Sequence, residues 1–597
     1  DARWLFDRVA SALLDIANPP AFRKVQVAKV TTASVEAYRS YLHGVRALHA
    51  WELDAADTAF GHATAIDSTF ALAYYKRAQT QGWRRGADTL SRYYARMAAQ
   101  NAARLPPRER TLVEGLLDIE EGNHARAQQR FGELLALDSS DAEAWYGYGD
   151  AYFHAIPASM EAVATNYTRS LRAFNRALLL DSAFHLAYSH RIEIYKRAGV
   201  QGFPWIVESD SLIYLPSEEA ARRLGRERIE RDRARAREQA IQTALHWVAV
   251  DPLAAPAYQS LADAYGAARR YDDAVATLQR AMRQPATRYA DFAYRIATYQ
   301  LPTQPARALA TLREALETYG PDSLRRRASG ARFQTLLAAA NVAMYAGALR
   351  ELDQLLHVIE ATDPVLPGSQ RSDRPTPITS VTAPLRLAVR AAAGASDPGD
   401  RHAIDATIAR LEAIPEPQGA VVRRQSAGMA YAAYLITGNP KYVDAVRRWS
   451  GRAPPLVLQA RMALAAADTT RAAQLAARFP PPDTARLVTP PDELRDPLSE
   501  AAVLSTVGQH RAALAVLESL DPSSFKVAEL DPRWAMYAQS VLGRAQLHEQ
   551  LGDRDLAIAA YERYLALIRD ADPTLQAEAQ GARTKLLALR DASRSQR

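Results

Sequence analysis

The stretch ALDSSDAEAWYGYGDAYFH, residues 136–154, decides the fold. It places Trp145, Tyr148-Gly149 and Tyr152 at intervals of three and four residues. Residues three and four apart share one face of an α-helix, so this interval predicts a helix with an aromatic face. The Asp-Ser pair in front of it is a turn signal. These aromatic residues either form a binding site or pack inside a repeating unit.

The pattern recurs along the chain at a nearly constant spacing. Positions aligned with Gly149 occur at 44, 78, 115, 192, 262 and 296, and the successive spacings through 149 are 34, 37, 34, 43, 70 and 34 residues. The values above 34 place insertions within or between units. Such self-similarity predicts stacked helical hairpins, each of which buries its apolar face only against its neighbours.

This pattern resembles the tetratricopeptide repeat (TPR), in which Trp-x2-Leu-Gly-x2-Tyr is followed by Ala-x3-Phe and Pro within about 34 residues. Trp145, Gly149 and Tyr152 match it, and the resemblance covers roughly residues 34–320 and 534–570. It implies an all-α fold, an α-solenoid of TPR and TPR-like helical hairpins. It also implies that Trp145 and Tyr152 are mostly core residues, because a small residue in the first helix lets the second approach closely.

Four segments are expected from the repeat spacing and from Pro/Ser-rich breaks near 361–380 and 477–497. They are an N-terminal capping helix and connector at 1–33, a TPR superhelix at 34–320 with an inserted loop at 201–239, TPR-like hairpins at 321–480 and a C-terminal TPR-like segment at 481–597. The sequence leaves open whether residues 321–533 continue or close the superhelix.

The insertion at 201–239 changes character at its middle. Its first half is apolar and aromatic, and we expect an ordered loop whose Phe203, Trp205 and Tyr214 help to close a pocket. Its second half pairs Glu and Arg at helical spacing and predicts a long solvated helix.

Composition excludes several classes of function. The 597 residues contain no cysteine, which rules out disulfides, thiolate zinc sites and cysteine nucleophiles. The 74 basic and 67 acidic residues are interspersed, so no nucleic-acid partner is expected. No apolar run approaches the ~18–20 residues of a membrane span. The lack of cysteine favours a periplasmic or extracellular location over the cytoplasm, and the start at Asp1 suggests a processed or truncated product.

No motif for catalysis or cofactor binding is present. The chain lacks GxxxxGK[ST], HExxH, GxSxG and a Gly-rich dinucleotide turn, so we expect no catalytic residue and no cofactor. We also expect no metal site, because helical histidines without a fixed i,i+4 partner are usually structural or at the surface. The histidines considered are His43, His49 and His62 along one unit, and His154, His185 and His190 in adjacent units.

The TPR resemblance supplies candidate binding residues. In such repeats the residue directly after the Gly position projects into the concave groove. So do the residues four before and three after that residue. The residues directly after the Gly position are Asp150, Glu193 and Asp263. Those four before them are Tyr146, Ser189 and Gln259, and Phe153 lies three after Asp150. Trp205 of the inserted loop is a further candidate. An acidic row beside aromatic residues suits a cationic or amide-rich peptide, or a ligand with an amine. The alternative is that these acidic residues are simply solvated.

Both ends of the chain also resemble the C-terminal TPR half of bacterial signalling proteins. The resemblance rests on VTTASVEAYRSYLHGVRAL at 30–48 and YERYLALIRDADPTLQAEAQGARTKLLAL at 561–589. In that group the N-terminal half is a serine/threonine kinase, a cyclase or a DNA-binding domain, and kinase signatures are absent from this chain. The resemblance implies a sensory role.

Three hypotheses of function follow. The first is a non-catalytic interaction or sensory module that binds a protein, peptide or small ligand in the groove of residues 34–300. The second is a structural scaffold or self-assembling subunit, since uncapped ends of repeat arrays associate. The third is an enzyme whose site is scattered over the central helices.

Overall fold

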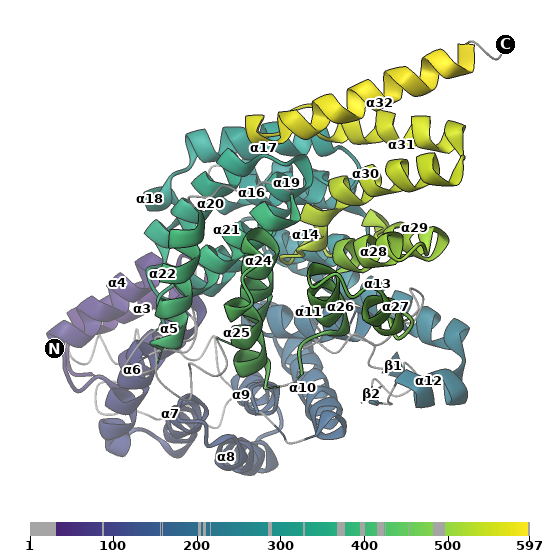
Figure 1. Ribbon diagram of the computed structural model, residues 1–597. Coiled ribbons are helices and arrows are strands. Elements are labelled where there is room, and N and C mark those ends of the chain that lie inside the picture. Colours follow the sequence, from purple (N-terminus) through teal and green to yellow (C-terminus); the bar gives the residue numbers. More distant parts are fainter. Residues whose placement is uncertain are drawn as a thin grey trace. The chain divides into compact units, whose positions relative to one another are not determined.

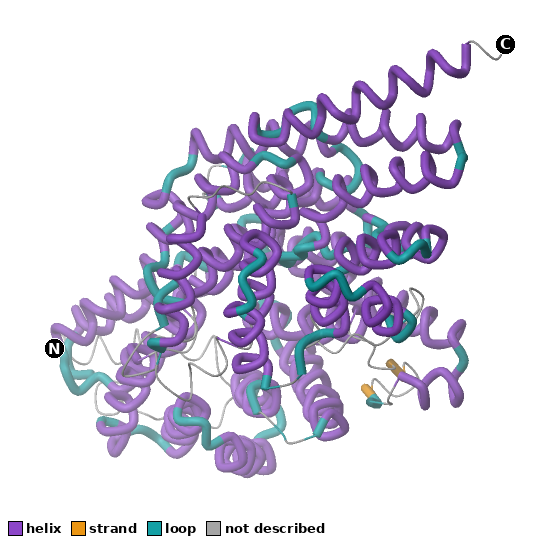
Figure 2. The backbone as a smooth tube through the Cα atoms, in the orientation of Figure 1, coloured by secondary structure: helices purple, strands orange, loops and turns teal. Residues whose placement is uncertain are grey.

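The computed structural model describes residues 32–594 with short gaps, and the described chain is helical almost throughout (Figures 1 and 2). The gaps are 86–88, 156, 158, 201–204, 207–210, 215–216, 285–288, 326–328, 367–375, 394–399, 415–422, 424–425, 452 and 481–495. The expected fold class, an all-α solenoid of TPR and TPR-like hairpins, is confirmed. None of the described helices combines the length and the apolar character needed to cross a bilayer.

The chain forms two compact units, of which unit 1 runs to Phe292 and includes 326–331. Its elements are α3 (Val35–His49), α4 (Leu53–Ile66), α5 (Ala71–Arg85), α6 (Thr89–Gln100), η2 (Ala102–Arg104), α7 (Pro107–Glu120), α8 (His124–Leu137), α9 (Ala142–Phe153), α10 (Met160–Leu180), α11 (His185–Val200), β1 (Trp205–Ile206), β2 (Ser211–Leu212), α12 (Ser217–Leu224), α13 (Arg226–Val250), α14 (Ala255–Ala267) and α15 (Tyr271–Met282). Helix α16 (Asp291–Gln300) crosses the boundary at Phe292.

Unit 2 contains Ala293–Arg325 and the chain from Arg332 onward. Its elements are α17 (Pro305–Thr318), α18 (Pro321–Leu324), most of α19 (Ser329–Ala346), α20 (Leu349–Thr362), α21 (Thr379–Ala392), α22 (Asp400–Glu412), α24 (Ala427–Thr437), α25 (Lys441–Ser450), α26 (Leu456–Ala465), α27 (Thr469–Ala476), α28 (Pro497–Thr506), α29 (His510–Glu518), η6 (Pro522–Ser524), α30 (Arg533–Leu551), α31 (Arg554–Leu567), η7 (Pro573–Leu575) and α32 (Gln576–Arg594).

Glycine and phenylalanine form the seams of the hairpins in unit 1. A Cβ atom added at Gly44 would lie 2.6 Å from the ring of Phe60. The ring of Phe131 lies between two glycines, and a Cβ at either Gly115 or Gly147 would approach it to 2.5 Å. These contacts are possible only without a side chain on the first helix, which explains the repeat pattern seen in the sequence.

The aromatic residues of the opening stretch pack as the sequence predicts. Tyr152 is 7% exposed. Trp145 is half-buried against the core formed around α7, α8 and α9, and its indole N–H donates to the carbonyl of Ser139 at 3.0 Å. The opening stretch is therefore half of a packed repeat rather than an open aromatic site.

The insertion contains a short strand pair and two helices. β1 and β2 pair antiparallel, with Trp205 opposite Leu212, and the amide of Leu212 donates to Thr168 Oγ1 on α10 at 2.8 Å. Helix α13 has 25 residues. Its first turns contain ion pairs such as that of Arg228 with Asp232 at 2.9 Å. The predicted long helix is present and is solvated on one face of its first half only, because Asp232, Ala236 and Trp247 are buried.

Two expectations are not decided by these observations. The capping helix predicted at the N-terminus lies within residues 1–31, outside the described residues. The predicted segment boundaries at 33/34, 320/321 and 480/481 remain predictions.

A buried amide joins distant parts of unit 2. Asn341 on α19 is fully buried, and its Nδ2 donates to the carbonyls of Glu529 at 2.7 Å and Val527 at 3.2 Å. Its Oδ1 accepts from the amide of Asp531 at 2.9 Å. The ring of Tyr345, one turn further on, contacts that of Trp534 at a centroid distance of 5.6 Å. Within unit 2 the chain therefore folds back on α19, although 188 residues separate Asn341 from Glu529.

We predict that Gly147→Ala destabilises the chain by about 1–3 kcal/mol, because its methyl group would overlap the ring of Phe131. Thermal or urea denaturation measures the change. The matched control is Gly132→Ala in α8, where the nearest atom to a new Cβ is Tyr148 Cε2 at 3.6 Å. That variant should gain about 0.5–1 kcal/mol of helix propensity. Equal stability of the two variants would contradict the close contact between Gly147 and the ring of Phe131.

We predict that Asn341→Ala costs about 2–4 kcal/mol, since it leaves buried main-chain groups of the 527–531 segment without partners. Urea denaturation of the full chain gives the loss. Gln354→Ala removes an exposed carboxamide from α20 of the same unit and serves as the control. A loss no larger than that of the control would show that the amide does not hold α19 to this segment.

Candidate functional site

Helices α9, α11 and α14 of unit 1 carry most of the residues singled out in the sequence. Helix α11 contacts both of the others, so the three form one face. Tyr146 is 6% exposed, and its ring packs on Phe174 at 5.8 Å and Phe184 at 5.3 Å. Tyr146 therefore belongs to the packing beneath this face.

Two of the three acidic residues of this face lie beside a charged lysine. Asp150 Oδ1 lies 3.3 Å from His190 Nε2, but burial lowers the pKa of His190 to about 4, so this ring is uncharged near neutral pH. Lys196 Nζ lies 3.2 Å from Glu193 Oε2 and 4.0 Å from Asp263 Oδ2. Burial alone would raise the pKa of Glu193, but the positive charge of Lys196 contributes to a net lowering. Lys196 thus compensates part of the negative charge of Glu193 and Asp263, whereas the charge of Asp150 has no cationic partner in His190.

The other candidates of unit 1 have different surroundings. The ring of Phe153 packs against that of His190 with centroids 4.5 Å apart, and Ser189 is half-buried beside it on α11. Gln259 Oε1 is buried and has no hydrogen-bond partner among the described residues. Trp205 lies in strand β1, and its side chain is outside the described part of the structure.

A buried carboxylate connects α9 to the preceding helices. Glu143 accepts hydrogen bonds from Lys76 Nζ at 2.7 Å and from Tyr75 Oη at 3.1 Å, and Arg108 lies 3.4 Å away. Burial alone would raise the pKa of Glu143, but the charges of Lys76 and Arg108 lower it to about 2. The carboxylate therefore stays ionised and ties α5, α7 and α9 together.

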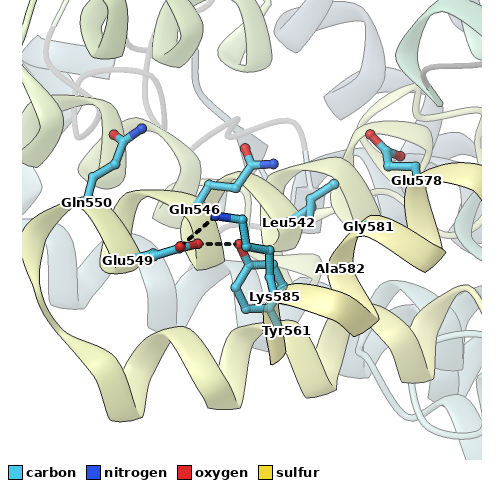
Figure 3. A pocket seen from close by; sticks show the side chains of 9 residues that line it. All are labelled: Leu542, Gln546, Glu549, Gln550, Tyr561, Glu578, Gly581, Ala582 and Lys585. Atoms are coloured by element: carbon cyan, nitrogen blue, oxygen red, sulfur yellow. Dashed lines mark hydrogen bonds and ion pairs between the residues drawn. The ribbon is translucent and has the colours of Figure 1, made fainter. Parts of the chain in front are cut away.

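An open groove runs along α30 in unit 2 and was not identified from the sequence (Figure 3). It has a volume of about 660 Å³ and opens to solvent. A second hollow of about 450 Å³ shares residues of α30 with it and extends to α28. The lining residues of the first are Leu542, Gln546, Glu549, Gln550, Tyr561, Glu578, Gly581, Ala582 and Lys585.

The rule that selected the candidates in unit 1 also finds this groove. Near the C-terminus the register position is Ala545, so the residue after it is Gln546. The residues four before and three after Gln546 are Leu542 and Glu549, and all three line the groove. The spacing around Ala545 therefore points to this groove in the sequence as well, although the candidate residues named above all lie in the N-terminal repeats and the inserted loop.

The groove combines amides, a buried apolar residue and one ion pair. Leu542 is 4% exposed, and the carboxamides of Gln546 and Gln550 point to the same side of α30 (Figure 3). Glu549 accepts from Lys585 Nζ at 2.8 Å and from Tyr561 Oη at 2.9 Å (Figure 3). The hydrogen bond from Lys585 contributes to the lowered pKa of Glu549. The groove can donate and accept hydrogen bonds, and its lining carries two carboxylates, Glu549 and Glu578, and one ammonium group, Lys585.

No family model and no curated protein matches this chain. Among solved structures, TTC0263, a thermophilic TPR protein of Thermus thermophilus, is 15% identical, with a TM-score of 0.26 over 44% of this chain and 99% of its own. The human IFIT1 dimer with m7Gppp-AAAA is 16% identical, with a TM-score of 0.36 over 60% and 74%. Yeast Tom70 is 12% identical, with a TM-score of 0.25 over 94% and 96%.

We predict that Glu143→Gln removes a stabilisation that depends on pH. The folded pKa of about 2 lies below the ordinary value of 4.5, so the carboxylate stabilises the fold above pH 4.5 and loses this effect as the pH falls towards 2. The difference in unfolding free energy between wild type and variant should reach about 3 kcal/mol near neutral pH and shrink across that window. Urea denaturation at several pH values measures it.

The control is Glu133→Gln, which removes one carboxylate from an exposed position of α8. A difference between wild type and Glu143→Gln that stays constant from pH 7 to acid would contradict the ionised, paired state of Glu143.

Proposed function

We propose that this chain is a non-catalytic interaction module that binds an extended segment of a partner protein in the α30 groove. The observation that supports the proposal is the pair of exposed side chains Gln546 and Gln550, which line the groove on one face of α30 above the buried Leu542. Repeat arrays of this type expose extended surfaces of that kind. A wide and shallow hollow suits a chain laid along it better than an enclosed small molecule.

The chemistry of the lining favours a peptide main chain. A carboxamide both donates and accepts, which matches the alternating N–H and C=O groups of an extended peptide. Gln546 makes no side-chain hydrogen bond within the described part of the chain. A ligand can therefore bind its carboxamide without breaking an internal hydrogen bond. Leu542 and Ala582 supply apolar contact, and the ion pair of Glu549 and Lys585 supplies charge at one side.

The face of α9, α11 and α14 is a second candidate surface for the same function. The buried Oε1 of Gln259, without a hydrogen-bond partner among the described residues, is the observation that favours it. Phe153, Ser189, Glu193 and Asp263 would then form its accessible part. Its paired charges favour a ligand of mixed polarity over the purely cationic one suggested by the sequence.

The resemblance of both chain ends to bacterial signalling proteins extends the proposal. We place the module in a sensory role, in which occupation of the groove is passed to an effector as a change in shape or rigidity. Differential binding to two states of the module is the thermodynamic requirement for such transmission. A measured change in the sedimentation or hydrogen exchange of the full chain on peptide binding would support this role.

We predict that a displayed library of random peptides, selected on the full chain, yields sequences that bind the wild type and lose affinity for the double variant Gln546→Ala/Gln550→Ala. Two lost hydrogen bonds should weaken binding about 10- to 30-fold. Fluorescence anisotropy of labelled peptides measures the affinities. Leu587→Ala is the control, because Leu587 is 59% exposed and lies about half a helical turn from the groove-lining face of α32.

Two results would count against the groove. Peptides that bind the double variant as tightly as the wild type must bind elsewhere, and the face of α9, α11 and α14 would be tested next through Gln259→Ala. If no peptide is enriched and the chain polymerises on concentration in sedimentation experiments, the scaffold hypothesis replaces the proposal.

A further inference from the structure

Three side chains of unit 1 direct their ligand atoms at one point. His154 Nε2 and His190 Nε2 are each 3.3 Å from Asp150 Oδ1, and the two nitrogens are 3.4 Å apart. The three atoms therefore form a nearly equilateral triangle. Asp150 and His154 are four residues apart at the end of α9, and His190 lies on the neighbouring α11.

The size of the triangle matches one kind of metal ion. Zn²⁺ binds histidine nitrogen and carboxylate oxygen at about 2.0–2.1 Å, so that the corners of its tetrahedron are about 3.3–3.4 Å apart. Octahedral Mg²⁺ at about 2.0–2.1 Å would require about 2.8–3.0 Å between adjacent ligands. Ca²⁺ permits longer separations but takes oxygen ligands, whereas two of these three atoms are imidazole nitrogens.

Hydrogen bonding alone leaves this cluster unsatisfied. His190 Nδ1 lies 3.3 Å from the carbonyl of Leu186, which can only accept, so this nitrogen carries the proton and Nε2 presents a lone pair. Asp150 Oδ1 is buried without a well-aligned hydrogen bond, although His154 Nε2 at 3.3 Å and the hydroxyl of Tyr146 face this carboxylate. One proton on His154 Nε2 can satisfy only one of these two acceptors, whereas a cation at the centre satisfies all three atoms.

The surroundings have the features of a built site. Asp150 is 8% exposed and His190 7% exposed, so both are more than nine-tenths buried. The ring of His190 is held between aromatic side chains, with centroid distances of 4.5 Å to Phe153 and 5.1 Å to Trp83. The hydrogen bond from His190 Nδ1 to a main-chain carbonyl is the usual outer support of a metal-binding histidine. His154 is half exposed and gives an ion access from solvent.

We propose that Asp150, His154 and His190 form a Zn²⁺ site with three protein ligands and a fourth position for water. Two histidines and one carboxylate are an established type of ligand set for this ion. The ion joins the last turn of α9 to α11 and so fixes the face on which Phe153 and Glu193 lie. The sequence expectation of no metal site compared histidines only with one another and overlooked Asp150 as the i,i+4 partner of His154.

The test is a titration of the tag-free, chelator-treated full chain with Zn²⁺, followed by calorimetry and thermal denaturation. We expect about one equivalent to bind and the Tm to rise with Zn²⁺ concentration. Co²⁺ in place of Zn²⁺ should give the intense visible absorption of a four-coordinate ion. His154→Ala should weaken Zn²⁺ binding by at least about 100-fold, because even outer-shell changes cost about 10- to 100-fold.

His154→Ala is the informative variant because half of its side chain is exposed, so its removal leaves the core packed. Asp150→Asn is a second variant of nearly equal volume that removes the charge. His62→Ala, at an exposed position of α4, is the matched control and should bind as the wild type does. Zn²⁺ binding that is equal in wild type, His154→Ala and Asp150→Asn, or the weak spectrum of six-coordinate Co²⁺, would overturn the proposal.

The proposals of a zinc site and of a peptide groove can be disproved independently of each other. The Gln546→Ala/Gln550→Ala variant should retain full Zn²⁺ binding, since its changes lie on α30 of unit 2. Absence of zinc binding would leave the peptide selection unaffected.

Discussion

The close approach of paired helices across glycine is the constraint on which the repeats of unit 1 depend. At Gly44, Gly115 and Gly149 a Cβ atom would lie 2.5–2.7 Å from a phenylalanine ring of the partner helix. The ring fills the space that the missing side chain leaves. Phe60 follows Gly44 and Phe131 follows Gly115 by the same 16 residues, whereas Phe174 follows Gly149 by 25 because α10 and the connection between α9 and α10 are longer. The repeat spacing in the sequence follows from this packing requirement. Each hairpin is stabilised by the contact between its own two helices and by contacts with its neighbours.

Packing this close also buries polar groups, and unit 1 pairs them internally. Glu143 is held by Lys76 and Arg108, and Glu193 by Lys196. An unpaired carboxylate at the position of Glu143 would lose hydration without compensation, and the two cations beside it prevent that loss. Compensation of this kind stabilises the array and reduces the net negative charge that Glu193 and Asp263 would otherwise offer to a ligand.

The α30 groove exists because side chains of different shape occupy equivalent positions. In unit 1 the positions of the binding rule hold Tyr146, Asp150 and Phe153, and the aromatic rings fill the space between helices. In the C-terminal repeat the corresponding residues are Leu542, Gln546 and Glu549, and open volume remains above them. The same backbone arrangement thus gives a packed interior in one unit and an accessible amide-lined surface in the other.

The sequence by itself determined the helical hairpins, their register, the burial of Tyr152 and the long helix in the second half of the insertion. These features depend on which residues share a helix face, and that is fixed by local spacing. The tertiary structure alone decided which charges meet across helices, how the histidines of α9 and α11 approach Asp150, and where Asn341 binds the chain 188 residues later. Such contacts depend on side-chain rotamers and on chain segments distant in sequence, and helical periodicity does not encode either.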